Sequence, residues 1–312
     1  MNKKGSILMI TLWILAILAV FVVGLGYRAS VNLTLARYQR DSLKAYYLAK
    51  AGINQAIISA KPDNPLKKNW DDGGYFECAL SNEEGKLNIN GHSDFDRDKL
   101  SILLILAQVE DAAELTNVII DWMNPVTTIE LAKKEPLKKP EELLLILEYF
   151  YQSKGIFDYR NKAQEAFAKV KDFITTYGDN KIDLNTAPLR VLEVIFGTTT
   201  KEMIDSGEAD KTIEGAIPNL LSAIDGYRQG AQKAGIEPFS STDINQEAIK
   251  KALGLAGQIN DQTKIIDRSV PYFTAIPSNL RIEAKGGFRN TTKRISVVYD
   301  RTAKNIVYWH QN

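Results

Sequence analysis

The chain begins with an apolar run that passes directly into an amphipathic segment. Between Ser6 and Gly26 no residue is charged, and thirteen are Leu, Ile, Val or Phe. From Val31 to Ala60 the apolar residues recur at intervals of three and four, which places them on one face of a helix. The proline of Lys61-Pro62 disfavours helix at the residue before it. The pattern predicts one continuous helix of about fifty residues, apolar in its first half and amphipathic in its second.

The apolar half of this helix is long enough to cross a membrane. About 20 apolar residues in helical conformation rise about 30 Å, the thickness of the hydrocarbon layer. Lys3 and Lys4 precede the run and Arg28 follows it, so the positive-inside rule places the N-terminus in the cytoplasm. A cleaved secretory signal is the rival interpretation, with a small-x-small pattern at Gly24–Gly26. Against it, the run exceeds the ~7–15 residues of a signal core, and the helical pattern continues past this point.

The rest of the chain changes from strand patterns to helix patterns and back. Alternation at Tyr75–Leu80 and Lys86–Asn90, around a polar turn, predicts a hairpin. From about Ser93 to Ile266 the apolar residues recur at helical spacing. The tail returns to alternation in the segments NLRIEAKGGF, TKRISVVYD and KNIVYWH. We therefore expect an α+β fold, in which an antiparallel sheet packs on the amphipathic half of the first helix and a large all-α domain is inserted between strands.

Composition and isolated reactive residues argue against an enzyme. The formal net charge of +1 gives no bias toward nucleic acid. The single cysteine, Cys78, cannot form an internal disulfide and is expected to be a small apolar residue on a strand. His92 and His310 are far apart, and neither lies beside a second ligand at a metal-binding spacing. No nucleophile is paired with a base at motif spacing. We expect no catalytic residue, no metal site and no cofactor.

Acidic residues alternate along Asp94–Asp98 in the manner of a calcium loop. The calcium template then requires Gly and Glu where this chain has Lys99 and Ile105. Carboxylates are also favourable in the first turn of a helix. We interpret the cluster as a helix start that is capped by Ser93 or Asp94.

The segment Lys181–Pro188 resembles the start of a helix-hairpin-helix element. Asn185-Thr186 would cap the helix, and Ala187-Pro188 would form its first turn. The DNA-binding form of this element presents backbone N–H groups to phosphate from a tight glycine-rich hairpin. The following FGTTTKEMIDSGEAD has no such hairpin and carries four acids, so we expect a structural role.

The order of these features resembles one protein family. A short basic leader that ends at Gly5, a hydrophobic helix and an amphipathic continuation are typical of type IV pilins and pseudopilins. The similarity to minor pseudopilin K of the type II secretion system extends over nearly the whole chain. It depends on the segments YYLAKAGINQAI, EEGKLNIN, DWMN, YGDNKIDLNTAPLRVL and DRSVPYFTAI and on the strands that end near Trp309.

The resemblance implies how the chain is processed and placed. Prepilin peptidase would cut between Gly5 and Ser6 on the cytoplasmic side and methylate Ser6, while the hydrophobic helix stays as a single-pass anchor in the inner membrane. The C-terminal domain would lie in the periplasm. The expected division is a leader at 1–5, a transmembrane and amphipathic helix at 6–60, first strands at 61–92, an inserted helical domain at 93–266 and last strands at 267–312.

Ile10 is the most informative departure from the family pattern. Most members carry Glu at this fifth mature position, where a carboxylate in the membrane costs about 2.5–3.5 kcal/mol unless it is paired. In the family its partner is the N-terminal amine of a neighbouring subunit, so a chain without the acid suits the end of a filament. The family's calcium-binding acidic segment is not transferred, because Asn124 and a poorly acidic stretch occupy its place.

The resemblance then implies a non-enzymatic subunit at the tip of the pseudopilus. Its partners would be minor pseudopilins I and J, the major pseudopilin and prepilin peptidase, and it would help to start or cap the filament that exports folded proteins. Three alternatives remain: a minor pilin of a type IV pilus, a membrane-anchored DNA-binding protein that uses the helix-hairpin-helix-like segment, and a plain membrane anchor outside any filament.

Overall fold

The protein folds as two compact units. The computed structural model describes residues 3–59, 66–91, 93–236, 238–239 and 244–311. The chain passes from the first unit to the second between Ser81 and Asn82 and returns between Leu280 and Arg281, and the turn Asp300–Asn305 also groups with the second. We call the first the sheet unit and the second the helical unit.

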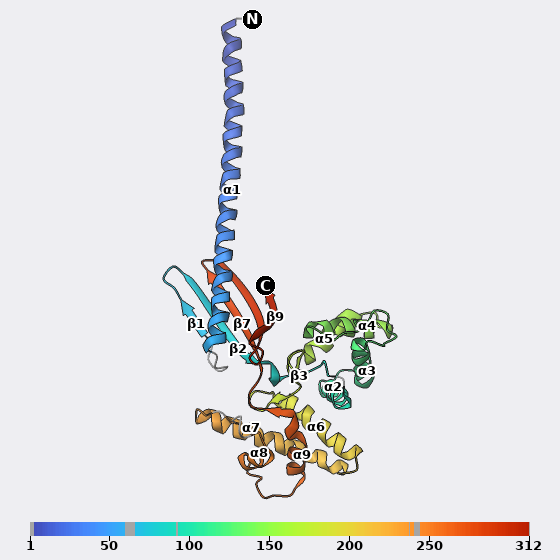
Figure 1. Cartoon of the computed structure of the whole chain (residues 1–312). Helices are drawn as coiled ribbons and strands as arrows, with labels where there is room; N and C mark the ends of the chain where they lie inside the picture. Colours follow the sequence, from blue (N-terminus) through green and yellow to red (C-terminus); the bar gives the residue numbers. More distant parts are fainter. Residues whose placement is uncertain (1–2, 60–65, 92, 237, 240–243, 312) are drawn as a thin grey trace. The chain divides into compact units, whose positions relative to one another are not determined.

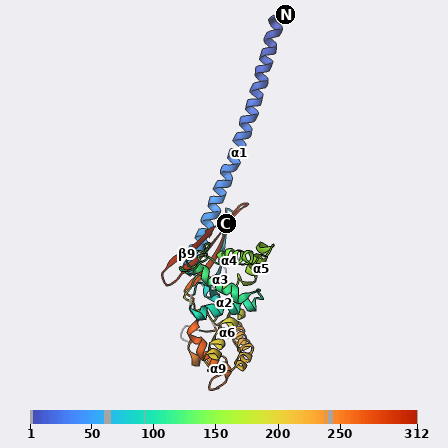
Figure 2. The same cartoon turned by 90° about the vertical axis from the view of Figure 1, so that its right-hand side faces the viewer.

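A single long helix, α1 (Lys3–Ser59), begins the sheet unit. Both views show it as one rod without a break (Figures 1 and 2). Its sequence contains no proline, and proline is the main cause of sharp helix kinks. The predicted continuous helix is confirmed.

The strands of the sheet unit form one five-stranded sheet in the order β1-β2-β7-β8-β9 (Figure 1). The last three strands are the ones that alternation in the tail predicted, and that prediction is confirmed. Their bounds are β1 (Leu66–Asn69), β2 (Gly74–Asn82), β7 (Asn279–Phe288), β8 (Thr291–Asp300) and β9 (Asn305–Gln311).

The predicted hairpin between Tyr75–Leu80 and Lys86–Asn90 is wrong. β2 pairs antiparallel with β1, in a register that places Leu66 opposite Cys78. The second segment supplies a strand of two residues, β3 (Leu87–Asn88), which pairs in parallel with β4 (Ile174–Thr175) inside the helical unit. A buried turn of 3-10 helix at Glu83–Gly85 separates β2 from β3. Alternation identified both strands correctly but not their partners.

Small residues bring α1 into close contact with the sheet. Ala45, Ala49 and Ala56 on its sheet-facing side are fully buried. A Cβ atom added at Gly286 of β7 would lie 2.1 Å from the Ala45 carbonyl oxygen and 2.3 Å from the Ala49 nitrogen. Because these are backbone atoms, β7 can approach α1 this closely only where its residue has no side chain.

The helical unit is built from eight α-helices and two short parallel strand pairs within the described part of the chain. Its helices are α2 (Asp94–Leu106), α3 (Ala112–Met123), α4 (Leu143–Ser153), α5 (Tyr159–Val170), α6 (Leu189–Asp205), α7 (Ile217–Lys233), α8 (Gln246–Ala252) and α9 (Asp261–Ser269). The second strand pair joins β5 (Ile182–Asp183) to β6 (Phe273–Thr274).

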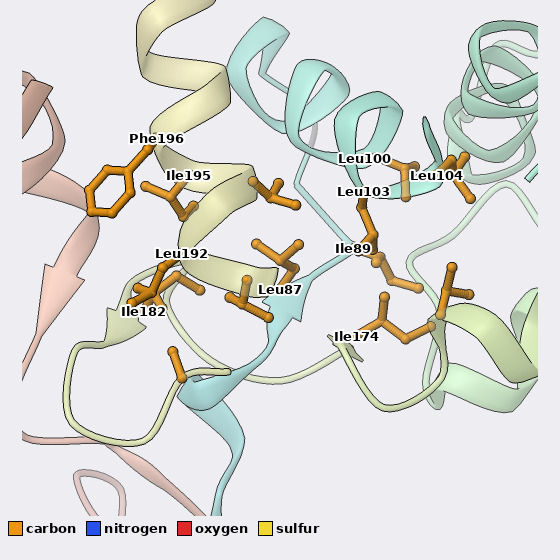
Figure 3. Packing of buried hydrophobic residues seen from close by; sticks show 14 of the residues in the cluster. Leu87, Ile89, Leu100, Leu103, Leu104, Ile174, Ile182, Leu192, Ile195 and Phe196 are labelled. Atoms are coloured by element: carbon orange, nitrogen blue, oxygen red, sulfur yellow. The ribbon is translucent and has the colours of Figure 1, made fainter. Parts of the chain in front are cut away.

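The strand segments lie inside the core of this unit. Figure 3 shows apolar side chains of β3, β4 and β5 meeting those of α2 and α6. The predicted helical stretch therefore also contains buried strands, which contribute to one continuous core. Its labelled members are Leu87, Ile89, Leu100, Leu103, Leu104, Ile174, Ile182, Leu192, Ile195 and Phe196.

Candidate functional site

The N-terminal half of α1 is a candidate membrane anchor. It is long and apolar enough to cross a bilayer by length and composition. The described large apolar side chains from Met9 to Leu25 are exposed rather than packed on the protein. An exposed apolar surface of this length has a favourable environment in lipid. The helix could therefore serve as a single membrane anchor.

The predicted processing residues lie at the start of this helix. Gly5 and Ser6, and the filament-contact position Ile10, have helical backbone in α1. The structure describes only the backbone at these three positions. Cleavage between Gly5 and Ser6, methylation of Ser6 and a filament role for Ile10 stay predictions.

Two ion pairs, Asp41–Arg289 and Lys44–Asp72, join the second half of α1 to turns of the sheet. The largely buried Asp41 carboxylate lies 2.9 Å from Arg40 and 3.7 Å from Arg289 of the β7–β8 turn. Lys44 donates a hydrogen bond of 2.8 Å to Asp72, and this bond lowers the pKa of the Asp72 carboxyl. These contacts add charge-specific orientation to the apolar helix–sheet interface.

Cys78 of β2 lies where α1 packs on the sheet, so its reactivity can report whether this packing is intact. The thiol is fully buried, and burial raises its pKa to about 11. A Cβ atom added at Gly52 of α1 would approach its Sγ atom to 2.5 Å. The expected strand position and buried apolar character of this residue are confirmed.

We expect Cys78 to resist alkylation in the folded chain. The thiolate is the reactive form, so a buried thiol with a raised pKa reacts slowly. Iodoacetamide at pH 8 should label the detergent-solubilised full chain at least about 100-fold more slowly than the same chain in denaturant. Intact mass reports the labelled fraction without ambiguity, because the chain has one cysteine. Rapid labelling without denaturant would contradict the described helix–sheet packing.

Buried carboxylates hold the segment by which the chain passes into the helical unit. Asp183, at the end of β5, is 1% exposed. Its carboxylate accepts hydrogen bonds from the Asn82 side chain at 3.0 Å, from the Asn185 backbone N–H at 3.0 Å and from the Thr186 hydroxyl. Burial, the largest cause, raises the Asp183 pKa although these hydrogen bonds oppose it. The donors thus compensate part of the desolvation of the carboxylate.

A second carboxylate joins the two ends of the helical unit. Glu84 is buried, and its two oxygens accept the Asn279 backbone N–H at 3.0 and 3.1 Å. The Asn279 side-chain amide also donates to Glu84 at 3.0 Å. The Glu83 carboxylate next to it accepts the Thr175 hydroxyl. The incoming segment of the unit is thereby bonded to its outgoing segment.

Sequence reasoning did not identify this carboxylate network. Its two segments were assigned other roles, a hairpin strand at Lys86–Asn90 and a helix start at Lys181–Pro188. Alternation places Asp183 on the face opposite Ile182, where a polar residue is expected to be exposed, but both residues of β5 are buried. The sequence pattern therefore carried no signal for this network. Arg228 of α7 donates to the carbonyls of Leu184 and Ala187, so a distant helix completes the network.

The acidic cluster before α2 is a helix start, as predicted. The Ser93 hydroxyl accepts the Asp96 N–H at 3.1 Å, and the Asp96 carboxylate accepts the Ser93 N–H at 3.1 Å. This reciprocal arrangement is a capping box. Lys99 and Lys201 pair with Asp96 and Asp98, respectively. Within the described residues no group of three or more His, Cys, Asp or Glu side chains is arranged to hold a metal ion.

The predicted cap of α6 is wrong. The helix begins after Pro188, and no side chain caps it. The Asn185 side chain instead exchanges two hydrogen bonds with the Phe239 backbone, and Thr186 binds Asp183. α6 also continues through Gly197 to Asp205. Of the two histidines, His310 lies on β9, and His92 is outside the described residues.

Comparison with known proteins identifies the fold. No family model matches the sequence, and no curated protein matches it. Among solved structures, a chain of the crystal structure of the GspK-GspI-GspJ complex from the enterotoxigenic Escherichia coli type 2 secretion system aligns with a TM-score of 0.56 and 11% sequence identity. The alignment covers 91% of this chain and 99% of that chain. The protein therefore has a GspK-like fold, a pilin-like α+β architecture with a helical unit placed between strands of the sheet.

Proposed function

We propose that this protein is a minor pseudopilin at the tip of a type II secretion pseudopilus. It acts as a structural subunit, not an enzyme, and helps to start or cap the filament that exports folded proteins. Its partners are minor pseudopilins I and J and the major pseudopilin. α1 anchors it in the inner membrane, with its N-terminus in the cytoplasm and both folded units in the periplasm.

The inserted helical unit is the observation that best supports the proposal. In the order of the chain, a helical unit of nearly two hundred residues is inserted between β2 and β7, which are neighbouring strands of a pilin-like sheet. The GspK-GspI-GspJ complex contains a chain that aligns over both parts, since 91% of this chain is covered. A minor pilin of a type IV pilus shares the long helix and the sheet, so the helical unit favours the secretion function.

Ile10 supports a terminal position in the filament. The apolar side chain has no charge to be neutralised in the membrane, whereas a carboxylate there requires a partner. A subunit at the tip has no neighbour above it to supply one. Ile10 is therefore compatible with the tip and would be unfavourable at a position that relies on such a pair.

Intact mass of the membrane-extracted protein tests the processing step. With prepilin peptidase co-expressed, we expect loss of Met1–Gly5 and the gain of one methyl group on Ser6. Without the peptidase the full chain should be recovered, because the proposal includes no other cut. A chain cut near Gly26, or one unchanged by the peptidase, would contradict the proposal.

Deletion of the gene separates the secretion function from the pilus function. A type II pseudopilin is required for release of folded proteins into the medium, while surface pili form normally. A minor pilin gives the opposite pattern. Complementation with the wild-type chain is the control for effects on neighbouring genes.

A further inference from the structure

The strand β9 leaves a long edge of the sheet open. It pairs with β8 on one side, and no described strand lies on its other side. Three of its apolar side chains are exposed: Ile306 at 40%, Val307 at 44% and Trp309 at 39%. An edge of this kind presents unpaired backbone N–H and C=O groups that another strand can bind.

The opposite edge of the same sheet is protected. β1 has four residues, of which Lys67 and Lys68 are two. β9 has seven residues and contains no Lys, Arg, Asp, Glu or Pro. Short length and lysines are the usual means of preventing edge pairing. The contrast within one sheet indicates that pairing is prevented at β1 and permitted at β9.

A groove lies beside the open edge, between it and α1. Its volume is about 380 Å³, and it is lined by Tyr38, Gln39, Ser42, Leu43 and Tyr46 of α1, Lys293 of β8 and Gln311 of β9. Side chains alternate between the two faces of a strand, so Val307 and Trp309 share the face of Gln311. A strand added beyond β9 would point every second side chain to this face, where Tyr38 and Leu43 of α1 are exposed.

Lys293 gives the groove a charge preference. It lies in the groove lining, and no carboxylate of the described residues pairs with it. Its neighbour Arg294 is exposed and, by strand alternation, points to the opposite face. A carboxylate on an added strand could reach Lys293 without displacing an existing partner.

A second copy of this chain is a poor occupant of the edge. Two β9 strands that pair antiparallel in one continuous sheet are related by a two-fold axis perpendicular to it. That axis would point the two α1 helices in opposite directions along the sheet. If α1 is the membrane anchor, both copies cannot enter the same membrane.

We propose that β9 and the adjacent groove bind an edge strand of a different pilin-like subunit, one that carries apolar side chains at alternate positions and a carboxylate opposite Lys293. The inference depends on the proposed function, since it assigns a binding surface to a pseudopilin partner. It concerns an edge-to-edge sheet contact, in addition to any contact made through α1.

Photo-crosslinking in the membrane tests the surface. The full chain is expressed with tagged minor pseudopilins I and J, and p-benzoylphenylalanine replaces Trp309 in β9, Lys67 in β1 or Leu35 in α1. We expect crosslinks to I or J from position 309 and none from position 67. Position 35, exposed on the anchor helix, reports whether the subunits assemble at all.

A matched pair of charge reversals tests the chemistry. Lys293→Glu should lower the yield of the position-309 crosslink about fivefold, whereas Arg294→Glu on the same strand should leave it within twofold. Crosslinks from position 35 without any from position 309, homotypic crosslinks at 309, or equal effects of both reversals would overturn the inference. Absence of crosslinks from all three positions would instead overturn the proposed function.

Discussion

Gly286→Ala is expected to destabilise the sheet unit by about 3 kcal/mol, the upper part of the range for overpacking. The added methyl group would lie 2.1 Å from one backbone atom of α1 and 2.3 Å from another. A helix backbone cannot move aside as a side chain can, so α1 must separate from β7 along the whole contact. Cys78 lies within the same unit and reports the separation, because its alkylation requires opening of the unit. The labelling rate should rise roughly a hundredfold.

The neighbouring glycine provides the control for this prediction. A Cβ atom added at Gly287 would meet the ring of Tyr75, 2.2 Å away. A ring at a side-chain end can rotate away at a smaller cost, so Gly287→Ala should raise the labelling rate less than Gly286→Ala. In the helical unit, Gly226 of α7 has open space around it, and Gly226→Ala should not change Cys78 labelling. Equal rates for the two β7 variants would refute the account given for Gly286.

Asp183→Ala is expected to destabilise the helical unit by about 3 kcal/mol. The change leaves the Asn82 amide, the Asn185 N–H and the Thr186 hydroxyl without their acceptor in a buried place. Hydrogen exchange followed by mass spectrometry on the full chain should show faster exchange in β5 and α6. Asp179→Ala is the matched control. Asp179 is an exposed acid in the turn that precedes β5, and its loss should cost less than about 1 kcal/mol.

Because of these same carboxylates, we expect the free energy of unfolding to fall as the pH rises above about 4. Burial raises the pKa values of Asp183 and Glu84 above their unfolded values, which are about 3.9 and 4.3. The folded chain therefore holds these protons more tightly than the unfolded chain. Their contribution to the free energy of unfolding is full below the unfolded pKa values and declines as the pH rises through the folded ones. In Asp183→Asn, whose side chain does not titrate, the decline between pH 4 and neutral pH should become smaller.

The parts of the fold that sequence predicted are those with strong periodicity. The run from Ser6 and the spacing after Val31 predicted α1, and strict alternation predicted β7, β8 and β9. β1 was missed because Leu66–Asn69 has one apolar residue and no alternation. β4 was missed because Ile174–Thr175 follows a helical pattern without a break, and two residues have no measurable period.

The hydrophobic pattern of the sequence alone could not predict which strands pair or which polar groups form networks. β3 pairs with β4, which lies far along the chain and far from the strand that alternation suggested. Alternation describes the faces of a strand and carries no information about its neighbour. The Asp183 network likewise depends on groups from distant segments, because Asn82 donates to the carboxylate and the charge of Arg228 acts on it. A resemblance to a known family supplied the overall arrangement but none of these contacts.

The bond between Glu84 and Asn279 has a consequence for the order of folding. β2 and β7 are adjacent in the sheet, yet the residues that join them are 195 apart in the chain. Closing a flexible loop of that length costs about 4–5 kcal/mol in chain entropy, and closing one of a few residues about 1–2 kcal/mol. Once the helical unit has folded, Glu84 and Asn279 hold its two ends together, so β2 and β7 meet as if joined by a short turn. We expect the helical unit to fold first and to serve as the template on which the sheet is completed.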